Sequence, residues 1–417
     1  MRMLNSILFM AIIAIWSILI VNLVLTIAGY LYYIKWVQTP PAKLPTEPPF
    51  VSILVPAHNE GVVLVRTVEA LLGFDYPQDR YELIVINDNS SDNSAILLAK
   101  FQAKYSNRNF QVINTNAETG GKGKSNALNV GLQQAKGSVI SVYDADNTPE
   151  EEALRHLVAT LMANPKLGAV IGKFRTRNRH ATLLTRFINI ETLAFQWMAQ
   201  AGRQKLFKLC TIPGTNYVIR RAVLDKIGGW DVKALAEDTE ISFRVYLMGQ
   251  QIAFQPLAVT WEQEPQTFDV WFQQRTRWVK GNIYVIVKNF RLLFHPQAHR
   301  IWFDLLYFMS TYFLLMAALV LSDVVFVMSV ADVVHVSIQG FSNAVWVFAI
   351  LLFVLSTFVT ITTEKGEMTV TNLGVICLMY VVYSQMWLVV AIYGMVGYTR
   401  EQIFHQQAKW YKTKRYQ

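Results

Sequence analysis

Four long stretches of the chain are mainly apolar and contain no Asp, Glu, Lys or Arg. They are residues 3–34, 305–322, 333–363 and 368–399. Each is close to or beyond the roughly 20 apolar residues with which a helix crosses a bilayer. We therefore expect transmembrane helices rather than buried core helices. The first stretch is too long for a cleaved signal peptide and lacks a small-x-small cleavage site, so we expect it to remain as an anchor.

The segment between the first two apolar stretches alternates short β-rich runs with helical ones. Strands are predicted over 51–57, 81–88, 110–115 and 138–146. Helices are predicted over 60–72, after Asp92, over 124–134 and from Pro149, where proline and the glutamates that follow it suit a helix N-terminus. This alternation predicts an α/β fold with a doubly wound, mostly parallel sheet.

The pattern divides the chain into an anchor, an α/β domain, interfacial amphipathic helices, about three C-terminal transmembrane helices and a basic tail. Their predicted bounds are 1–35, 36–265, 266–300, 301–400 and 401–417, in that order. After three more spans, the basic tail would lie on the opposite side from the α/β domain, against the tendency of basic segments to stay inside. Either the tail charge is tolerated, or one apolar stretch contains an extra span or a helix in the membrane plane.

Composition agrees with a membrane protein, because 53% of the 417 residues are hydrophobic and 16% are charged. The net charge of +9 does not indicate nucleic-acid binding, because many basic residues flank the apolar stretches. They are Lys35, Lys43, Lys280, Lys288, Arg291, Arg300, Lys409, Lys412, Lys414 and Arg415. Their placement favours contact with anionic lipids of the cytoplasmic leaflet.

The segment 331–342 has no Lys or Arg and is expected outside, which leaves the α/β domain in the cytoplasm. Cys210 and Cys377 are expected to be packing residues.

Polar clusters follow the predicted strands. "PAHNE" (56–60) ends the first strand, "NDNSSD" (87–92) ends the second, a Gly/Lys loop (120–125) follows the third, and "DADN" (144–147) ends the fourth. Ligands bind at the carboxyl ends of strands in such sheets, so these clusters predict a site rather than helix caps alone. The Gly/Lys loop is not a P-loop, because Glu118 stands at the first glycine position. No Gly-x-Gly-x-x-Gly follows the first strand, which argues against a Rossmann dehydrogenase.

Three carboxylates carry the predicted chemistry. Asp144 and Asp146 flank one residue at a strand end and are expected to bind Mg²⁺ or Mn²⁺, which would bridge to the phosphates of a nucleotide diphosphate. Asp238, in "AEDTE", has the character of a general base if the fold returns it to the same cleft. Taken alone, Asp238 also fits a helix N-cap.

The sequence "QQRTRW" (273–278) combines three useful groups. Gln274 offers a hydrogen-bonding amide, Arg277 a guanidinium that suits a diphosphate, and Trp278 a flat surface for a sugar ring. The same segment fits an amphipathic helix at the membrane surface, and both interpretations hold together.

Taken in order, "PAHNE", "INDNSSD", "GKGKSNALNVG", "DAD", "ED" and "QQRTRW" resemble the motifs of the membrane-embedded processive glycosyltransferases of family 2. These include the cellulose, chitin and hyaluronan synthases, and the arrangement of spans looks most like the poly-β-1,6-N-acetylglucosamine synthases. The resemblance covers nearly the whole chain. It implies a multi-pass protein of the plasma membrane with a cytoplasmic GT-A-like domain. The implied reaction is inverting transfer from a UDP-sugar, best guessed as UDP-N-acetylglucosamine, to a growing exopolysaccharide of the biofilm type that is extruded across the membrane. A small accessory membrane or export subunit is a further implied partner.

The resemblance also implies roles for single residues. Ala57, Glu60 and Asp88 would bind the nucleoside, Lys124 its phosphates, Asp144 the nucleotide sugar, and Asp146 with Asp144 the metal. Asp238 would be the catalytic base. Gln274, Arg277 and Trp278 would hold the diphosphate and the acceptor end, while Gly214 and Thr215 of "PGTNYV" would line the acceptor site.

Two departures from the family pattern change neighbours of these residues and not the residues themselves. Asn87 and Asn89 flank Asp88 where the family usually has Asp and Gly, and Ala236 replaces a threonine before Glu237 and Asp238. The segment 359–366, "VTITTEKG", faintly resembles a gating loop of cellulose synthases, although a plain loop between spans is preferred. Two alternatives remain open: a non-processive transferase that loads sugar onto a polyprenyl phosphate, and a non-catalytic membrane subunit of polysaccharide assembly.

Overall fold

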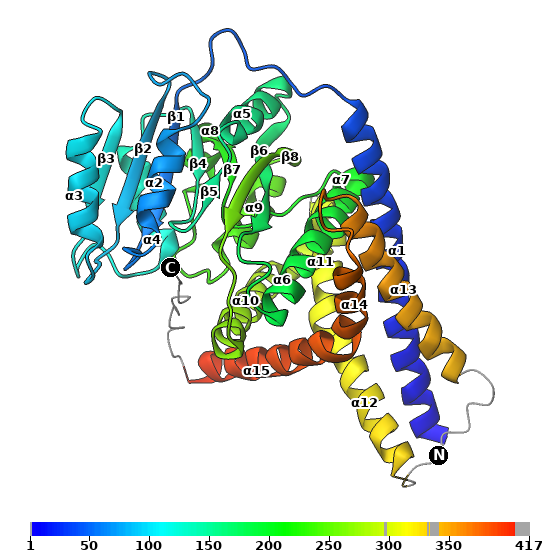
Figure 1. Ribbon diagram of the computed structural model, residues 1–417. Helices are drawn as coiled ribbons and strands as arrows, with labels where there is room; N and C mark the ends of the chain where they lie inside the picture. Colours follow the sequence, from blue (N-terminus) through cyan, green and yellow to red (C-terminus); the bar gives the residue numbers. More distant parts are fainter. Residues whose placement is uncertain (1, 296–297, 332, 334–341, 405–417) are drawn as a thin grey trace.

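The computed structural model describes residues 2–295, 298–331, 333 and 342–404 (Figure 1). The part that we call the sheet domain is built on one eight-stranded sheet with the order β3-β2-β1-β4-β7-β6-β8-β5. The strands are β1 (Val51–Ala57), β2 (Tyr81–Asn87), β3 (Phe110–Asn114), β4 (Val139–Val142), β5 (Thr148–Pro149), β6 (Leu167–Thr176), β7 (Tyr217–Arg220) and β8 (Gln251–Glu262). Four of the seven pairings are parallel, and β7 runs antiparallel to both of its neighbours. The predicted α/β class is confirmed, with a sheet that is mixed rather than uniformly parallel.

Helices cover both faces of this sheet. One face carries α2 (Leu64–Leu72), α3 (Ser94–Lys104) and α5 (Ala153–Ala163), and the other carries α4 (Lys124–Gln134), α8 (Arg221–Ile227) and α9 (Glu237–Leu247). Side chains alternate between the faces along each strand. In β1, Ile53 and Val55 therefore join the core under α2, while Leu54 joins the core under α4. A strand that is buried on both faces reads as a continuous apolar run, which is why these strands were visible in the sequence.

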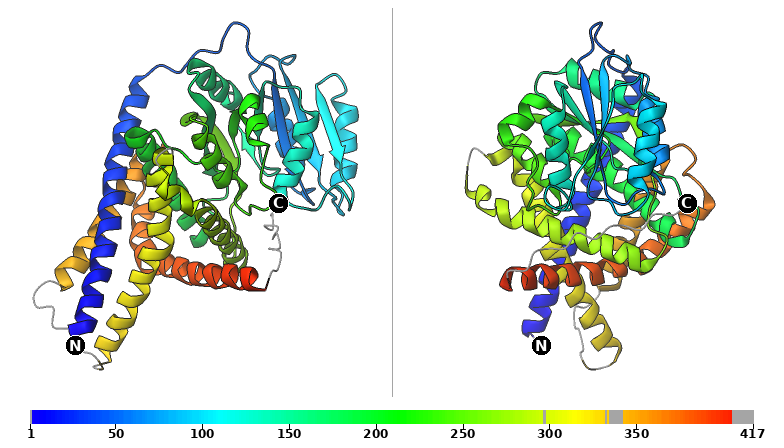
Figure 2. Two further views of the ribbon diagram at one scale, coloured as in Figure 1. Left: turned by 180° about the vertical axis from the view of Figure 1, so that it is seen from behind. Right: turned by 90° about the vertical axis from the view of Figure 1, so that its left-hand side faces the viewer.

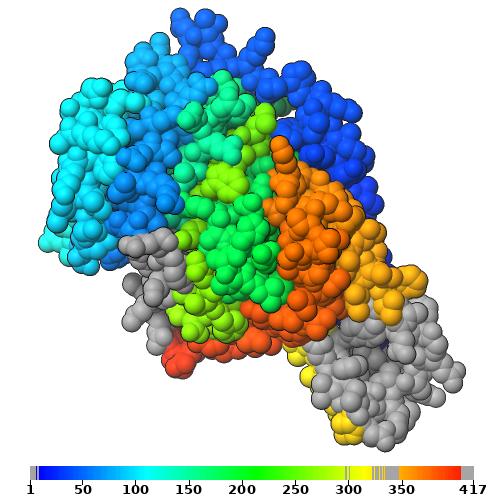
Figure 3. Space-filling view, in the orientation of Figure 1, coloured from blue at the N-terminus to red at the C-terminus, as the bar shows by residue number. Residues whose placement is uncertain are grey.

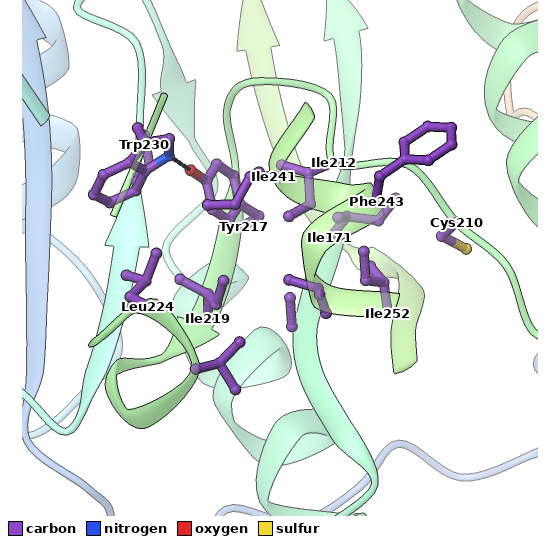
Figure 4. Close-up of a cluster of buried hydrophobic side chains, with 14 of the residues drawn as sticks. Ile171, Cys210, Ile212, Tyr217, Ile219, Leu224, Trp230, Ile241, Phe243 and Ile252 are labelled. Carbon is purple, nitrogen blue, oxygen red and sulfur yellow. Dashed lines mark hydrogen bonds between the residues drawn. The ribbon is translucent and has the colours of Figure 1, made fainter. Parts of the chain in front are cut away.

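The core under α4 contains a polar contact. The indole Nε1 of Trp230 donates to the hydroxyl of Tyr217 at 3.2 Å among buried aliphatic side chains (Figure 4). This bond satisfies both polar atoms, so neither carries the cost of an unpaired buried group.

Two sequence predictions about helix starts are wrong. Pro149 does not begin a helix; it lies in β5, paired with Thr260 of β8, and α5 begins only at Ala153. β5 is at the edge of the sheet, where the missing N–H of a proline removes no ladder hydrogen bond. The helix predicted over 60–72 begins at Leu64, because residues 61–63 form a turn that follows the first strand.

The first apolar stretch is one long helix, α1 (Arg2–Gln38), of 37 residues. At about 1.5 Å per residue it is longer than the roughly 30 Å hydrocarbon core. Its last turns pack on the sheet domain, where the Tyr32 hydroxyl donates to the carbonyl of Phe254 at 2.7 Å. A Cβ on Gly29 would lie 1.8 Å from the carbonyl oxygen of Trp197, so this close crossing requires glycine. The C-terminal part of α1 is therefore packed closely against the sheet domain.

The remaining helices connect the sheet to the apolar segments. In chain order they are α6 (Leu183–Ala194), η1 (Phe195–Gln200), α7 (Ala201–Phe207), α10 (Phe268–Asn289), η2 (Phe290–Phe294), α11 (His299–Met309), η4 (Ser310–Leu315), α12 (Met316–Val330), α13 (Ser342–Thr362), α14 (Val370–Leu378), η5 (Met379–Tyr383) and α15 (Ser384–Ile403). The helix predicted for the "QQRTRW" segment is α10. Most of the predicted outward loop at 331–342 and of the basic tail at 401–417 lies outside the described residues.

Within the described residues, three helical segments are long and apolar enough to cross a membrane: Phe9–Gln38, Ile301–Leu321 and Val370–Ile403. A fourth, Val347–Thr362 in α13, is shorter. The third segment is not one straight rod. α14 runs alongside the other apolar helices, whereas α15 turns and runs crosswise beneath the sheet domain (Figures 1 and 2). This geometry favours the in-plane alternative for the last apolar stretch.

The turn between α13 and α14 is fixed to the sheet domain by a buried ionic cluster. Glu364 binds Lys173 at 2.6 Å and Arg175 at 2.6 Å, and Glu367 binds Arg175 at 2.6 Å. The Trp197 indole also donates to Glu364, at 3.1 Å. On the surface, the segment after α13 lies directly against the part of the chain around α6 (Figure 3). The stretch predicted as a plain loop between spans is therefore docked on β6.

Candidate active site

The structure brings every predicted site residue to one cleft of about 1490 Å³. The cleft begins at the carboxyl ends of β1, β2 and β4 and continues over α10 to η4 and α15. The predicted residues that line it are Ala57, Glu60, Asp88, Lys124, Asp144, Asp146, Gly214, Thr215, Asp238, Gln274, Arg277 and Trp278. Their convergence was predicted, and the role of each stays a prediction.

Asp88 organises the loops at the β1 and β2 ends of the cleft. Its backbone N–H donates to the carbonyl of Ala57 at 2.7 Å, and its Oδ1 accepts from the N–H of Gly121 at 2.9 Å and from the Thr115 hydroxyl at 3.0 Å. These bonds tie the Gly/Lys loop to the end of β2. Glu60 is buried in the same wall of the cleft.

The Gly/Lys loop ends at the N-terminus of α4. Gly123 precedes the helix with a φ of 97°, in the region that favours glycine, and Lys124 is the first helical residue. A helix N-terminus carries a partial positive charge and unpaired N–H groups, so anions bind well there. The loop can therefore receive phosphate groups although it is not a P-loop.

Lys124 lies at the centre of the charged groups. Its Nζ is 2.6 Å from Oδ1 of Asp144 and 3.3 Å from Oε1 of Glu237, and it donates to the carbonyl of Gly214 at 2.8 Å. Burial lowers the pKa of the Lys124 ammonium, but Asp144 and Glu237 outweigh burial and the net shift of its pKa is upward. The lysine therefore stays charged throughout the physiological range.

Asp238 is the second residue of α9 and faces the same group of charges. A Cβ on Gly214 would lie 2.9 Å from Oδ2 of Asp238 and 3.4 Å from Nζ of Lys124, which places both groups around one point. Burial and the neighbouring carboxylate of Glu237 raise the pKa of Asp238 to about 7, against the opposing effect of Lys124. A carboxylate with a pKa close to neutrality suits a general base.

The Asp144-Ala145-Asp146 turn is held from the side of β7. Thr215 accepts from the N–H of Asp144 at 3.0 Å, and its hydroxyl donates to Asn147. The hydroxyl of Thr215, predicted to line the acceptor site, thus supports the turn that contains Asp144 and Asp146. Arg177 donates to the carbonyl of Asp146 at 2.9 Å.

The two carboxylates of this turn fit a divalent cation only in part. Asp144 and Asp146 both line the cleft, and carboxylate oxygens are the ligands that Mg²⁺ and Mn²⁺ prefer. Among the described residues, no group of three or more His, Cys, Asp and Glu side chains could hold a metal ion by itself. Mg²⁺ in proteins is commonly held by one or two carboxylates together with substrate phosphates.

The "QQRTRW" helix, α10, forms the floor of the cleft. Gln274 is buried, Arg277 is half-buried and Trp278 is 39% exposed, and all three line the cavity. Arg275 stacks on Trp278 with the guanidinium carbon 3.8 Å from a ring centroid, which fixes the indole in place. The helix predicted for this segment, α10, thus forms the floor of the cleft.

Sequence reasoning missed several lining residues, among them Glu237, Glu191 and Trp387. Glu237 was quoted within "AEDTE" but given no role, although it contacts Lys124. Glu191 is a lone carboxylate in the apolar helix α6, which was a visible clue. Trp387 lies in an apolar stretch where tryptophan is ordinary, so no local pattern could reveal that it reaches the cleft.

Comparison with known proteins agrees with this geometry. Residues 48–281 match a family described as "Glycosyltransferase like family 2". A Bacillus subtilis (strain 168) protein named "Probable glycosyltransferase YdaM" is 46% identical over 414 residues, which cover 99% of this chain and 98% of that protein. The poly-β-1,6-N-acetyl-D-glucosamine synthase of Staphylococcus epidermidis is 30% identical over 240 residues, which cover 58% of this chain and 56% of the synthase.

The fold also matches a solved structure, the mannosyltransferase PcManGT from Pyrobaculum calidifontis in complex with GDP-Man and Mn²⁺. The TM-score is 0.66 at 19% sequence identity, and the match covers 96% of this chain and 99% of the other. At this identity the match concerns the fold alone. The predicted GT-A-like fold joined to apolar helices is confirmed.

Proposed function

Because the chain belongs to glycosyltransferase family 2, we propose that it polymerises a UDP-sugar into an exopolysaccharide at the cytoplasmic face of the plasma membrane. The observation that carries the proposal is the single cleft in which Asp88, Lys124, Asp144 and Asp238 meet the "QQRTRW" helix. UDP-N-acetylglucosamine is the proposed donor, supported by the 30% identity to a poly-β-1,6-N-acetyl-D-glucosamine synthase. Processive synthesis and export of the product through the apolar helices are parts of the same proposal.

The proposed reaction is a single displacement with inversion at the anomeric carbon. The acceptor hydroxyl oxygen bonds to that carbon, the bond from the carbon to the β-phosphate oxygen breaks, and the hydroxyl proton passes to Asp238. Lys124 and Arg277 stabilise the negative charge that develops on the leaving UDP. Asp144 and Asp146 would hold a divalent cation, which would supply further neutralisation of the diphosphate.

Membrane vesicles containing the full chain test the proposal directly. They are given radiolabelled UDP-N-acetylglucosamine, UDP-glucose or GDP-mannose, and the products are separated into polymer and solvent-extractable glycolipid. Polymer from a UDP-sugar is expected, and vesicles with Asp238→Asn serve as the control. Glycolipid alone would support the polyprenyl phosphate alternative, and no product from any donor would support a non-catalytic subunit.

A further inference from the structure

A buried arginine lies behind the cleft, where the sheet domain meets an apolar helix. Arg203 of α7 is 1% exposed, and its Nη1 donates to Oδ1 of Asp304 at 2.9 Å. Asp304 is itself buried, and it is the only Asp, Glu, Lys or Arg in the sequence of the candidate membrane span Ile301–Leu321. The ion pair therefore joins α7 to this span at its one charged position.

A second guanidinium nitrogen connects Arg203 to the wall of the cleft. Its Nη2 donates to the Thr211 hydroxyl at 3.2 Å and to Oε1 of Gln200 at 2.8 Å. Gln200 in turn holds the backbone of Thr211, because its Nε2 donates to the Thr211 carbonyl at 2.6 Å and its Oε1 accepts from the Thr211 N–H at 2.9 Å. Thr211, which lines the cleft, is thus held by the buried side chains of Arg203 and Gln200.

The chain from this point onward contacts residues that are assigned to donor binding. We call residues 211–215 the wall segment, and all of them line the cleft. The carbonyl of Gly214 accepts from Nζ of Lys124 at 2.8 Å, and the Thr215 hydroxyl accepts from the N–H of Asp144 at 3.0 Å. The position of the wall segment therefore bears directly on the groups expected to hold the diphosphate and the cation.

The wall segment is also bonded to α9, the helix that carries the proposed base. The N–H of Ile212 donates to the Ser242 hydroxyl at 2.9 Å, and that hydroxyl donates to the carbonyl of Asp238 at 2.7 Å. Ile212 and Ser242 are both buried. A shift of the wall segment would therefore disturb Lys124, Asp144 and the backbone of Asp238 together.

Arg203 also faces the apolar side of the same cleft. Its guanidinium carbon lies 5.8 Å from the ring centroid of Phe308, which belongs to the same span as Asp304 and lines the cleft. Tyr312, one turn later in this span, lines the cleft as well. One guanidinium thus contacts both the wall segment of the sheet domain and the span that faces it.

Stability alone does not account for this arrangement. Taking two charges out of water is costly, and apolar side chains of similar volume in place of a buried ion pair often keep or raise stability. A pair that only held α7 on α11 would need the bond between Arg203 and Asp304 and nothing more. The additional bonds to Gln200 and Thr211 lead toward the cleft instead.

We propose that Arg203 is a positioning residue for the transfer reaction, which fixes the wall segment relative to the Ile301–Leu321 span. The inference rests on the proposed function, because it concerns the alignment of a donor with Asp238. Arg203 does not line the cleft, so it acts through the wall segment and not on the substrate. Small errors of alignment lower the rate of a reaction strongly, so transfer should depend on Arg203 more than the affinity for UDP does.

A paired apolar replacement separates positioning from stability. Arg203→Met together with Asp304→Leu removes both charges, so the purified full chain in lipid nanodiscs should keep a Tm and a Kd for UDP close to those of the wild type. The kcat for transfer, measured with the UDP-sugar that the vesicle assay identifies, should fall about tenfold or more. Hydrogen–deuterium exchange should become faster at the backbone amides of the wall segment, because Thr211 and Gln200 lose the donor that orders them.

Two further variants complete the comparison. Arg203→Lys keeps a cation opposite Asp304 but lacks the second arm of the guanidinium, so it should lose less kcat than the double variant. The matched control is Lys205→Ala, which removes a cation from the same helix outside the cleft. It should leave kcat, UDP binding and the exchange of the wall segment unchanged.

Each result decides the role of Arg203. A double variant with the kcat and the exchange of the wild type would overturn the positioning role. A parallel loss of Tm, UDP binding and kcat would also overturn it, because Arg203 would then contribute to the fold in general. If the wild type binds no UDP while the double variant exchanges faster in the wall segment, the proposed donor is wrong and the anchoring of the wall segment by Arg203 stands.

Discussion

The Nζ of Lys124 lies 2.6 Å from a carboxylate oxygen of Asp144, one of the two residues expected to bind the metal. The same ammonium is 3.3 Å from Oε1 of Glu237, and it lines the cleft that is proposed to hold the nucleotide diphosphate. The group that pairs with Asp144 is therefore also the one expected to bind a phosphate oxygen.

Replacing Lys124 should weaken nucleotide binding more than any other single change in the Gly/Lys loop. A charge-assisted hydrogen bond to a phosphate contributes about 1.5 to 3 kcal/mol, so Lys124→Ala should weaken UDP affinity roughly 10-fold to 100-fold. Isothermal titration of the purified chain with UDP measures the change. Lys136→Ala, an exposed lysine just after α4 that does not line the cleft, is the control. An unchanged UDP affinity for Lys124→Ala would contradict the assigned role.

Asp238 should give the transfer reaction a pH dependence. Its pKa is raised to about 7, and a general base works in its deprotonated form, so the rate should rise with pH up to about 7 and level off above. Asp238→Asn should lower the rate by about 10² to 10⁴ and leave UDP binding intact. Initial rates between pH 5 and 9, with UDP titrations as the folding control, check both statements. A flat profile below pH 7 would remove the base role.

The same raised pKa has a consequence for stability. A carboxyl group that holds its proton more tightly in the folded state than in the unfolded state stabilises the fold at low pH, and this contribution is lost as pH rises to about 7. Asp238→Asn, which is neutral at every pH, should therefore raise Tm relative to wild type at pH 8 and leave Tm nearly unchanged at pH 4. Thermal unfolding of the two proteins at both pH values measures the difference. A variant less stable than wild type at pH 8 would contradict the shift.

The sequence predicted well the end of the cleft at which Asp88 and Asp144 lie, and the reason is physical. β1, β2 and β4 are parallel and buried on both faces, so their apolar runs were visible and their carboxyl ends had to meet at one edge. Asp88 and Asp144 could therefore be placed together before any coordinates were known. Asp238 joined them through the resemblance to family 2, since nothing in the local pattern of α9 indicates where its first turn points.

The end of the cleft that contains Glu191 and Trp387 could not be predicted in the same way. Glu191 meets Arg275 across 84 positions of sequence and Trp387 across 196, and no periodicity relates residues that are so far apart. The order of β6, β7 and β8 in the sheet could not be predicted from the sequence for the same reason. Pro149 misled because proline suits both a helix N-terminus and an edge strand, and only the pairing with β8 decides between them.

The ionic cluster that docks the turn after α13 should contribute strongly to stability. Arg175 is 7% exposed and binds both Glu364 and Glu367, so Arg175→Ala leaves two buried carboxylates short of a partner. Breaking such a buried pair costs about 3 to 5 kcal/mol. Arg179→Ala removes a more exposed partner of Glu367, 3.4 Å away, and should cost about 1 kcal/mol or less. Thermal unfolding compares them, and equal falls in Tm would contradict a structural role for the buried cluster.

The crosswise orientation of α15 predicts the side of the membrane on which the chain ends. One face of α15 packs on α10, where a Cβ on Gly394 would lie 2.6 Å from Val279. The opposite face exposes Val389, Ile392, Val396 and Ile403 at helical spacing, as in a helix that lies in the surface of a bilayer. If α15 does not cross, the tail stays on the side of the sheet domain.

Reporter fusions decide this topology. A C-terminal fusion after Phe404 should be fluorescent with green fluorescent protein and inactive with alkaline phosphatase, because the tail is expected in the cytoplasm. A phosphatase inserted after Val333, in the segment without Lys or Arg, should be active and serves as the control. A cytoplasmic tail would agree with the positive-inside tendency, because the tail sequence contains Lys409, Lys412, Lys414 and Arg415. An active phosphatase at the C-terminus would show that α15 spans the membrane, and the crosswise helix would then not describe the protein in its bilayer.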